Sequence, residues 1–280
     1  DVAAGAITDA AGNDNTAAAT QFAFTHDRTA PTATITSTEV STGGSLNEAV
    51  TFTVTFNEEM TGIADGDFTV SGATCVLSDY TVATANTIFT QICTPDTNGE
   101  LTTLSVGVVG TDPAGNNNAA ATDFTFTYDT TRPTIDTVAV AGATEDGYGV
   151  ASTYVVTITP SETLGAVPTL TVTGGSITTA GAASNANYVY TVTPTDADEA
   201  MTVVVAVGHA TDSAGNTNAA ASNNFGWTHD ATAPTITTVA VAGATEDAYG
   251  VASTYVVTIT PSETLASAPT LTVTGGSITT

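Results

Sequence analysis

The chain has 280 residues, with 28 acidic side chains against two basic ones, a formal net charge of −26 and an apolar share of 41%. So few basic residues exclude nucleic-acid binding and binding to anionic lipid headgroups, because both begin with Lys and Arg side chains that displace counterions. The absence of Lys also excludes Schiff-base chemistry and a Walker-type phosphate loop, whereas the apolar share is large enough to fill hydrophobic cores.

The sequence contains no run of 18 apolar residues, and its first residues lack the basic start and apolar stretch of a signal peptide. We therefore expect no direct membrane insertion in this segment. Its two cysteines are too few for a disulfide scaffold or for a zinc site.

An internal repeat of about 101 residues organises the chain. Residues 133–179 return as residues 234–280 with changes at only five positions, 136, 147, 165, 166 and 167. More diverged copies of two motifs carry the same period through the chain. They are the loops TDAAGNDN, TDPAGNNN and TDSAGNTN, from Thr8, Thr111 and Thr211, and the linkers HDRTAPT, YDTTRPT and HDATAPT, from His26, Tyr128 and His229.

The period predicts four parts, with boundaries at the proline of each linker. Residues 1–29 are the C-terminal part of a preceding repeat, residues 30–131 are the first complete repeat, residues 132–232 are the second complete repeat, and residues 233–280 are the N-terminal part of a further repeat. We therefore expect the chain to be a window on a longer repetitive protein.

Within a repeat, apolar residues alternate with threonine, which is typical of strands with one buried face and one wet face. Gly, Asn, Asp and Pro clusters separate the strands, and no stretch shows a convincing helical stripe. In chain order, strands are expected in the Phe22–His26 register and at Thr32–Ser37, Val50–Phe56, Asp67–Val70, Thr87–Cys93, Leu101–Val109, Phe124–Tyr128, Thr153–Thr159, Thr169–Thr173, Tyr188–Thr193, Met201–Val207 and Phe225–His229.

Repeats of this length with about seven short strands predict an all-β fold of tandem immunoglobulin-like β-sandwiches. A mucin-like, O-glycosylated stalk is the alternative for a threonine-rich chain, but it would have proline-dense tracts without periodicity. Threonine here alternates with Val, Ile and Phe, as on the exposed face of a sheet.

The repeats resemble the bacterial Ig-like repeats of large secreted adhesins and other cell-surface repeat proteins. The resemblance rests on FNEEM at Phe56, on PSETL at Pro160 and Pro261, on the T-D-x-A-G-N loop and on the D-x-T-x-P-T linker, and it extends over essentially the whole chain. The resemblance implies export to the cell surface. Repeats of this family serve as stalks, as spacers and as binding tips, so the resemblance does not choose among these roles.

Acidic residues are the strongest candidates for a functional site. In an Ig-like sandwich, the loop after the second strand and the loop before the last strand lie at the pole where the chain enters from the preceding repeat. Oxygen ligands without Cys or His are what a hard cation such as Ca²⁺ requires. The expected ligands are Asp27, Glu58, Asp112 and Asn116 at one junction, Asp129, Glu162, Asp212 and Asn216 at the next, and Asp230 and Glu263 at a third. The alternative is that these Asp and Asn residues only form turns without any metal.

A disulfide is expected between Cys75 and Cys93, because Ala73–Val82 and Thr87–Cys93 can run antiparallel around Ala83–Asn86. Such a bond would support an extracellular compartment. The alternative is two buried free thiols.

Catalytic residues are not expected. His209 lies near Asp212 and Ser213, but no nucleophile elbow or oxyanion loop accompanies it. We therefore expect a non-enzymatic structural or adhesive segment, a rod-like stalk or extracellular fibre whose partners are adjacent repeats and other copies in a filament. The alternative is a spacer or carbohydrate-binding accessory module of a secreted enzyme.

Overall fold

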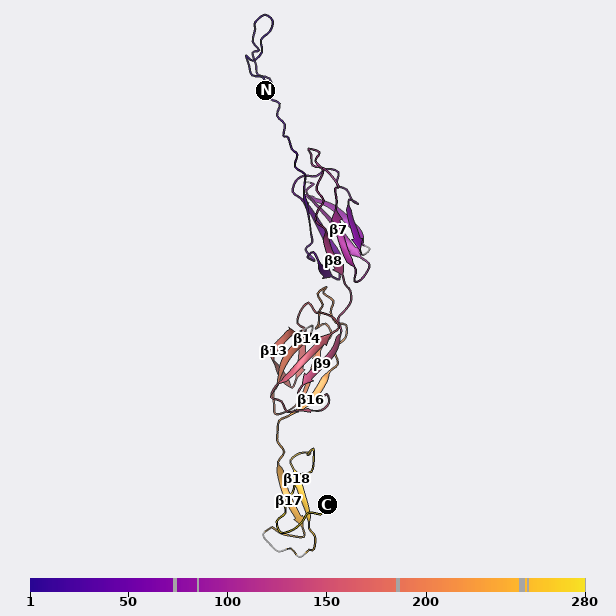
Figure 1. The fold of residues 1–280 in the computed structure, drawn as a ribbon, viewed down its shortest axis with the longest axis vertical. Coiled ribbons are helices and arrows are strands. Elements are labelled where there is room, and N and C mark those ends of the chain that lie inside the picture. Colours follow the sequence, from indigo (N-terminus) through magenta and orange to yellow (C-terminus); the bar gives the residue numbers. More distant parts are fainter. Residues whose placement is uncertain (73–74, 85, 185–186, 247–249, 251, 280) are drawn as a thin grey trace. The chain divides into compact units, whose positions relative to one another are not determined.

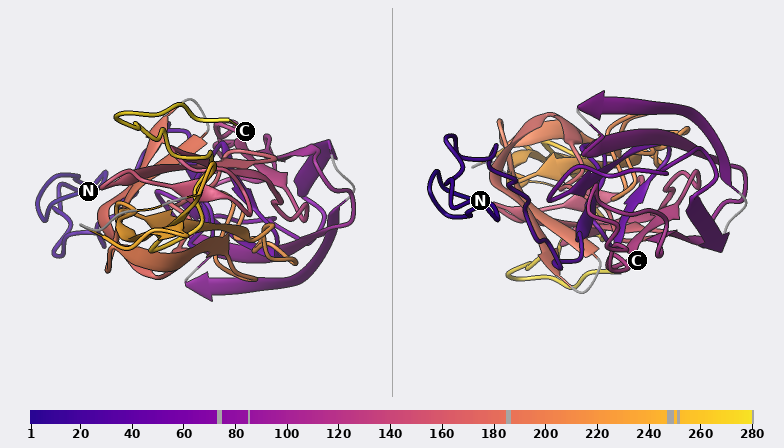
Figure 2. Two further views of the ribbon diagram at one scale, coloured as in Figure 1. Left: turned by 90° about the horizontal axis from the view of Figure 1, so that it is seen from below. Right: turned by 90° about the horizontal axis from the view of Figure 1, so that it is seen from above.

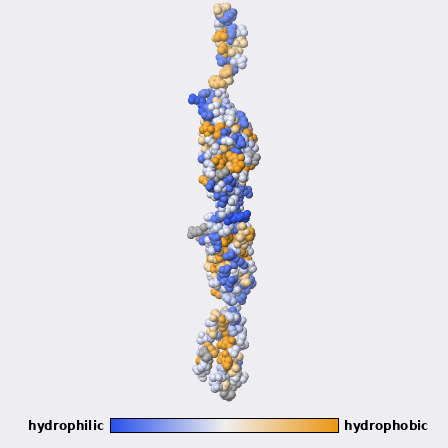
Figure 3. Space-filling view, turned by 90° about the vertical axis from the view of Figure 1, so that its right-hand side faces the viewer, coloured by the Kyte–Doolittle hydropathy of each residue, from blue (hydrophilic) through white to orange (hydrophobic). Residues whose placement is uncertain are grey.

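The computed structural model describes residues 1–280 except 73–74, 85, 185–186, 247–249, 251 and 280. The described residues form strands, turns and extended segments, without a helix; the two views of Figure 2 show the strands as arrows. None of these residues lies in a helix long and apolar enough to cross a membrane. On the face drawn in Figure 3, hydrophobic and hydrophilic residues are interspersed.

The chain divides into two compact units. The first contains residues 1–134, 160–168 and 207–221, and the second contains residues 135–159, 169–206 and 222–280. The repeat boundaries expected from the sequence, near residues 30, 132 and 233, stay a prediction.

The first unit contains two four-stranded sheets, ordered β1-β3-β6-β5 and β2-β8-β7-β4. All of their pairs are antiparallel except β2 with β8, which is parallel. The strands are β1 (Ala33–Thr36), β2 (Gly44–Leu46), β3 (Val50–Phe56), β4 (Phe68–Gly72), β5 (Cys75–Thr84), β6 (Ile88–Pro95), β7 (Leu101–Val106) and β8 (Phe124–Tyr128).

The core of the first unit lies between these two sheets. In β3 every second residue, from Val50 to Phe56, is buried, while the threonines between them are only half-buried. The Phe52 ring packs 5.4 Å from the Phe124 ring and 5.9 Å from the Phe126 ring, both on β8. The period-two alternation in the sequence therefore becomes the buried face of one sheet, packed against the other.

The second unit repeats this arrangement, with sheets β13-β14-β11-β9 and β10-β16-β15-β12 and a separate β17-β18 pair. In Figure 1, β9, β13 and β14 belong to one sheet and β16 to the other. The strands are β9 (Ile135–Ala141), β10 (Tyr148–Gly149), β11 (Tyr154–Pro160), β12 (Leu170–Thr173), β13 (Gly175–Ser184), β14 (Asn187–Pro194), β15 (Asp198–Val205), β16 (Phe225–Asp230), β17 (Ile236–Ala242) and β18 (Val256–Pro261).

The Ig-like sandwich predicted from the sequence is confirmed, but individual strands differ. No strand forms at Phe22–His26, where the Phe22 and Phe24 side chains are exposed. The equivalent strand of the next repeat, β8, lies between β2 and β7. No described residues pair with Phe22–His26 in this way. The strand expected at Leu101–Val109 ends at Val106, because the next residues turn to bond the Asn118 side chain. Sequence reasoning missed β2, β9, β10, β13, β17 and β18.

Candidate metal centres

The T-D-x-A-G-N loops at Thr111 and Thr211 fold around a buried aspartate. Asp112 is 2% exposed and Asp212 is 4% exposed. Asp212 accepts hydrogen bonds through Oδ1 from the backbone N–H of Ala214, at 2.9 Å, and of Asn216, at 2.8 Å. Gly215 has φ of +95°, a left-handed conformation that favours glycine. The motif is thus a turn closed by its own aspartate.

Each loop asparagine completes this turn through its side chain. The Asn116 amide Nδ2 donates to Asp112 Oδ2 at 2.8 Å, and the Asn216 Nδ2 donates to Asp212 Oδ2 at 2.9 Å. Both asparagines were themselves expected as ligands, and they do lie beside the expected carboxylates, but with their donor groups directed at them.

Three carboxylates meet at each of two positions in the first unit. Oxygens of Asp27, Glu58 and Asp112 all lie within 4.8 Å of one another. The same arrangement recurs with Asp129, Glu162 and Asp212. In each cluster the linker supplies one carboxylate, the loop after the second long strand of the repeat supplies the glutamate, and the T-D-x-A-G-N loop supplies the buried aspartate. The structure thus brings together six of the predicted ligands, in two sets with the same make-up.

The pKa of the glutamate is raised in both clusters. Partial desolvation, followed by repulsion from Asp27 and Asp112, raises the pKa of Glu58. Desolvation and repulsion from Asp212 and Asp129 raise the pKa of Glu162 in the same way. The pKa of Asp112 is lowered, chiefly by the hydrogen bond from the Asn116 side chain. In both clusters, the surroundings therefore disfavour the charged form of the glutamate.

This predicts a pH dependence of stability in cation-free buffer. A glutamate whose folded pKa is raised binds its proton more tightly in the folded chain, so its contribution is complete below the ordinary value of 4.5 and is lost as pH rises through the raised pKa. Denaturant unfolding in excess chelator should show stability falling over that window. The double variant Glu58→Gln, Glu162→Gln should flatten the profile, whereas the exposed control Glu48→Gln should not; an unchanged double variant would contradict the assignment.

The third expected pair, Asp230 and Glu263, lies in the second unit. Both line one pocket of about 470 Å³, together with Val150. The Asp230 carboxylate accepts the backbone N–H of Thr232 at 3.2 Å. Glu263 Oε1 is buried and has no hydrogen-bond partner among the described residues. Among the described residues that line this pocket, Asp230 and Glu263 are the two that carry a carboxylate.

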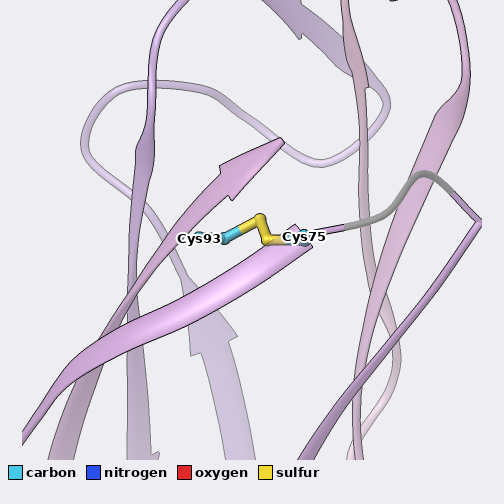
Figure 4. Close-up of a disulfide and its surroundings, with 2 residues drawn as sticks. All are labelled: Cys75 and Cys93. Atoms are coloured by element: carbon cyan, nitrogen blue, oxygen red, sulfur yellow. A yellow bond between two sulfur atoms is a disulfide. The ribbon is translucent and has the colours of Figure 1, made fainter. Parts of the chain in front are cut away.

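A disulfide joins Cys75 and Cys93 across β5 and β6, with their Cα atoms 5.6 Å apart. Figure 4 shows the bond between the two strands. Cys93 is fully buried in the core of the first unit. The expected start of the first arm at Ala73 and the turn at Ala83–Asn86 include residues 73 and 85, which lie outside the described residues.

Comparison with known proteins identifies the fold family for part of the chain. Residues 27–128 match the family described as bacterial Ig-like domain. No curated protein matches the chain. Among solved structures, one titled "Structure of Yersinia pseudotuberculosis adhesin InvE" is 17% identical, with a TM-score of 0.29, over 70% of this chain and 58% of that one. This chain thus spans little more than half of that adhesin chain.

The family match begins at the linker residue Asp27 and ends with β8, so it includes both sheets of the first unit and the whole of its first carboxylate cluster. The resemblance expected from the motifs is confirmed for this part of the chain. Residues 27–128 belong to the bacterial Ig-like domain family.

Proposed function

We propose that this chain is a non-enzymatic structural segment of a long secreted repeat protein with an adhesin-type role at the cell surface. The bacterial Ig-like domain at residues 27–128 supports this, as does the near-identity of residues 133–179 and 234–280. A stalk needs length, and each repeat in it meets only its neighbours, whereas a catalytic site gains little from serial copying. The proposed partners are adjacent repeats of the same chain and other copies in a fibre.

We further propose that the two carboxylate clusters bind Ca²⁺ and order the linkers. The main support is that the same cluster occurs twice, each time with one linker aspartate, one glutamate and one buried loop aspartate. Three carboxylates so close together repel one another unless a proton or a cation is present, and the chain has only two basic residues to offer. Backbone carbonyls and water would complete the six to eight oxygens that Ca²⁺ takes.

Calorimetric titration of the 280-residue chain with CaCl₂ tests the sites. We expect about two binding events, and loss of one of them in each of Asp27→Asn and Asp129→Asn. Asparagine at these positions keeps an oxygen for the turn but removes the charge. The control Asp123→Asn changes an exposed aspartate outside both clusters and should bind as the unmodified chain does. No heat of binding would overturn the calcium proposal.

Calcium should also stiffen the linkers. At a concentration 100-fold above Kd, binding adds about 2.7 kcal/mol per site to the ordered junction. Small-angle scattering should give a larger maximum dimension in calcium than in excess chelator, and Asp129→Asn should reduce the difference. An unchanged dimension would show that the acidic loops act only as turns. Electron micrographs of native material would then separate isolated stalks from ordered fibres.

A further inference from the structure

The same Asp–Asn pairing occurs in all three T-D-x-A-G-N loops of the chain. In the loop at Thr8, Asp9 Oδ1 accepts the backbone N–H of Asn13 at 2.9 Å, and Asp9 Oδ2 accepts its side-chain Nδ2 at 2.9 Å. The loops at Thr111 and Thr211 repeat both bonds. One side-chain N–H of each asparagine is thereby committed to the loop, and the other is free for a different acceptor.

The second N–H is directed at the linker in both loops that have one before them. Asn116 Nδ2 donates to the main-chain oxygen of Asp27 at 3.3 Å. Asn216 Nδ2 donates to the main-chain oxygen of Asp129 at 2.8 Å. Both linker aspartates turn their own chain in the same way, with Oδ1 accepting the N–H two residues on. Each asparagine thus joins the buried loop aspartate to the backbone of the linker aspartate.

The orientation of the Asn216 amide is fixed by its surroundings. Its Nδ2 faces a carboxylate oxygen and a carbonyl oxygen, which a flipped amide oxygen would repel. Its Oδ1 accepts a hydrogen bond from Asn47 Nδ2 at 2.9 Å. This oxygen is therefore already used by a protein donor, which argues against Asn216 as a calcium ligand.

The linker after β8 has a second support on its other side. Asn98 Oδ1 accepts the Thr130 backbone N–H at 2.6 Å, and Asn98 Nδ2 donates to Thr131 Oγ1 at 2.9 Å. The Asp129 N–H donates to the Leu46 carbonyl at 3.0 Å. These bonds involve neutral groups and no cation.

We propose that Asn116 and Asn216 are positioning residues. Each one hydrogen-bonds the linker backbone to the buried loop aspartate without a cation, and we call this pair of bonds the clasp. The clasp places the linker carboxylate in its cluster before calcium binds. This last step rests on the proposed calcium sites, whereas the clasp itself does not. The shorter contact and the additional partners at Asn216 make the Asp129 linker the more firmly held of the two.

Hydrogen exchange of the full chain in excess chelator tests the clasp, because exchange reports local opening. In Asn216→Ala, peptides spanning residues 127–134 should exchange about three- to tenfold faster, as expected for loss of one or two hydrogen bonds, and Asn116→Ala should have a smaller effect on residues 25–32. Core strands β14 and β15 should be unchanged, which separates the effect from general unfolding. Asn117→Ala changes an exposed neighbour of Asn116 in the Thr111 loop and is the matched control for Asn116→Ala.

Asn216→Asp distinguishes a clasp from a ligand. It keeps the shape and supplies an oxygen for a cation, but removes both N–H donors and adds a charge beside Asp212. A clasp predicts faster linker exchange in chelator for this variant, whereas a ligand role predicts unchanged exchange in chelator. Unchanged exchange in both Asn216 variants would overturn the clasp even if calcium binds, and faster exchange would support it even if calorimetry shows no calcium binding.

Trypsin gives an independent readout at the first linker. Trypsin cuts after Arg and Lys, and the sequence has two Arg residues and no Lys. Arg132 precedes a proline, so the Arg28–Thr29 bond is the one site that trypsin favours. In chelator, Asn116→Ala should be cut severalfold faster at this bond than the unmodified chain or Asn117→Ala. Equal rates would contradict the clasp at this linker.

Discussion

Replacing Phe52 by alanine is expected to lower the free energy of unfolding of the first complete repeat by about 3 to 5 kcal/mol. The side chain is 1% exposed, and its ring contacts Phe124 and Phe126 of the facing sheet. Alanine would leave a cavity between two sheets whose backbones are fixed by their ladders, so little collapse can fill it. Denaturant unfolding, followed by an aromatic signal, measures the change.

The control for this variant is Thr53→Ala, one residue further along β3 and on the opposite face. Its effect should be within about 1 kcal/mol, because Thr53 is only half-buried and the change removes part of one cross-strand pair. Similar losses for both variants would show that β3 does not have one buried and one wet face.

Reduction of the Cys75–Cys93 disulfide is expected to cost about 3 kcal/mol of stability, the chain-entropy value for a loop of this size. Only the first complete repeat has this bond. The second carries Val192 on β14, facing the core as Cys93 does on β6. A reductant should therefore lower the unfolding midpoint of the first repeat alone.

The double variant Cys75→Ser, Cys93→Ser should match the reduced chain and should not respond to reductant. Thiol titration under denaturing conditions without reductant should give no free cysteine in the unmodified chain. Two free thiols per chain would contradict the disulfide.

The sequence predicts well those strands in which apolar residues alternate with threonine, because their burial depends on a local pattern. Val50–Phe56 was expected as a strand and is β3, residue for residue, with its apolar positions buried. The short β2 and β10 have no such pattern, since two or three residues cannot show a period. Each exists because it pairs in parallel with the last strand of its repeat, an arrangement of the folded chain that no local sequence signal carries.

The carboxylate clusters were also predictable, because a known topology places the two loops and the linker at one pole. The roles of the asparagines were not. Asn116 and Asn216 offer both an oxygen and an N–H group, and only the neighbouring acceptors decide which one faces the cluster. Asn47 and Asn98 were missed altogether. The Asn98–Gly99 pair indicates a turn, but nothing in it shows that the Asn98 side chain reaches Thr130 and Thr131.

The parallel pairing of β2 with β8 has a mechanical consequence for a chain held under tension. Tension enters this repeat through β1 and β2 and leaves it from β8 into the linker, so the two paired strands are pulled in opposite directions along their common axis. Their ladder bonds lie across the line of pull and share the load, and they must rupture together rather than unzip one after another. The same geometry recurs between β10 and β16. Each repeat can thus transmit a drag force from one end to the other through a short patch of shear-loaded hydrogen bonds.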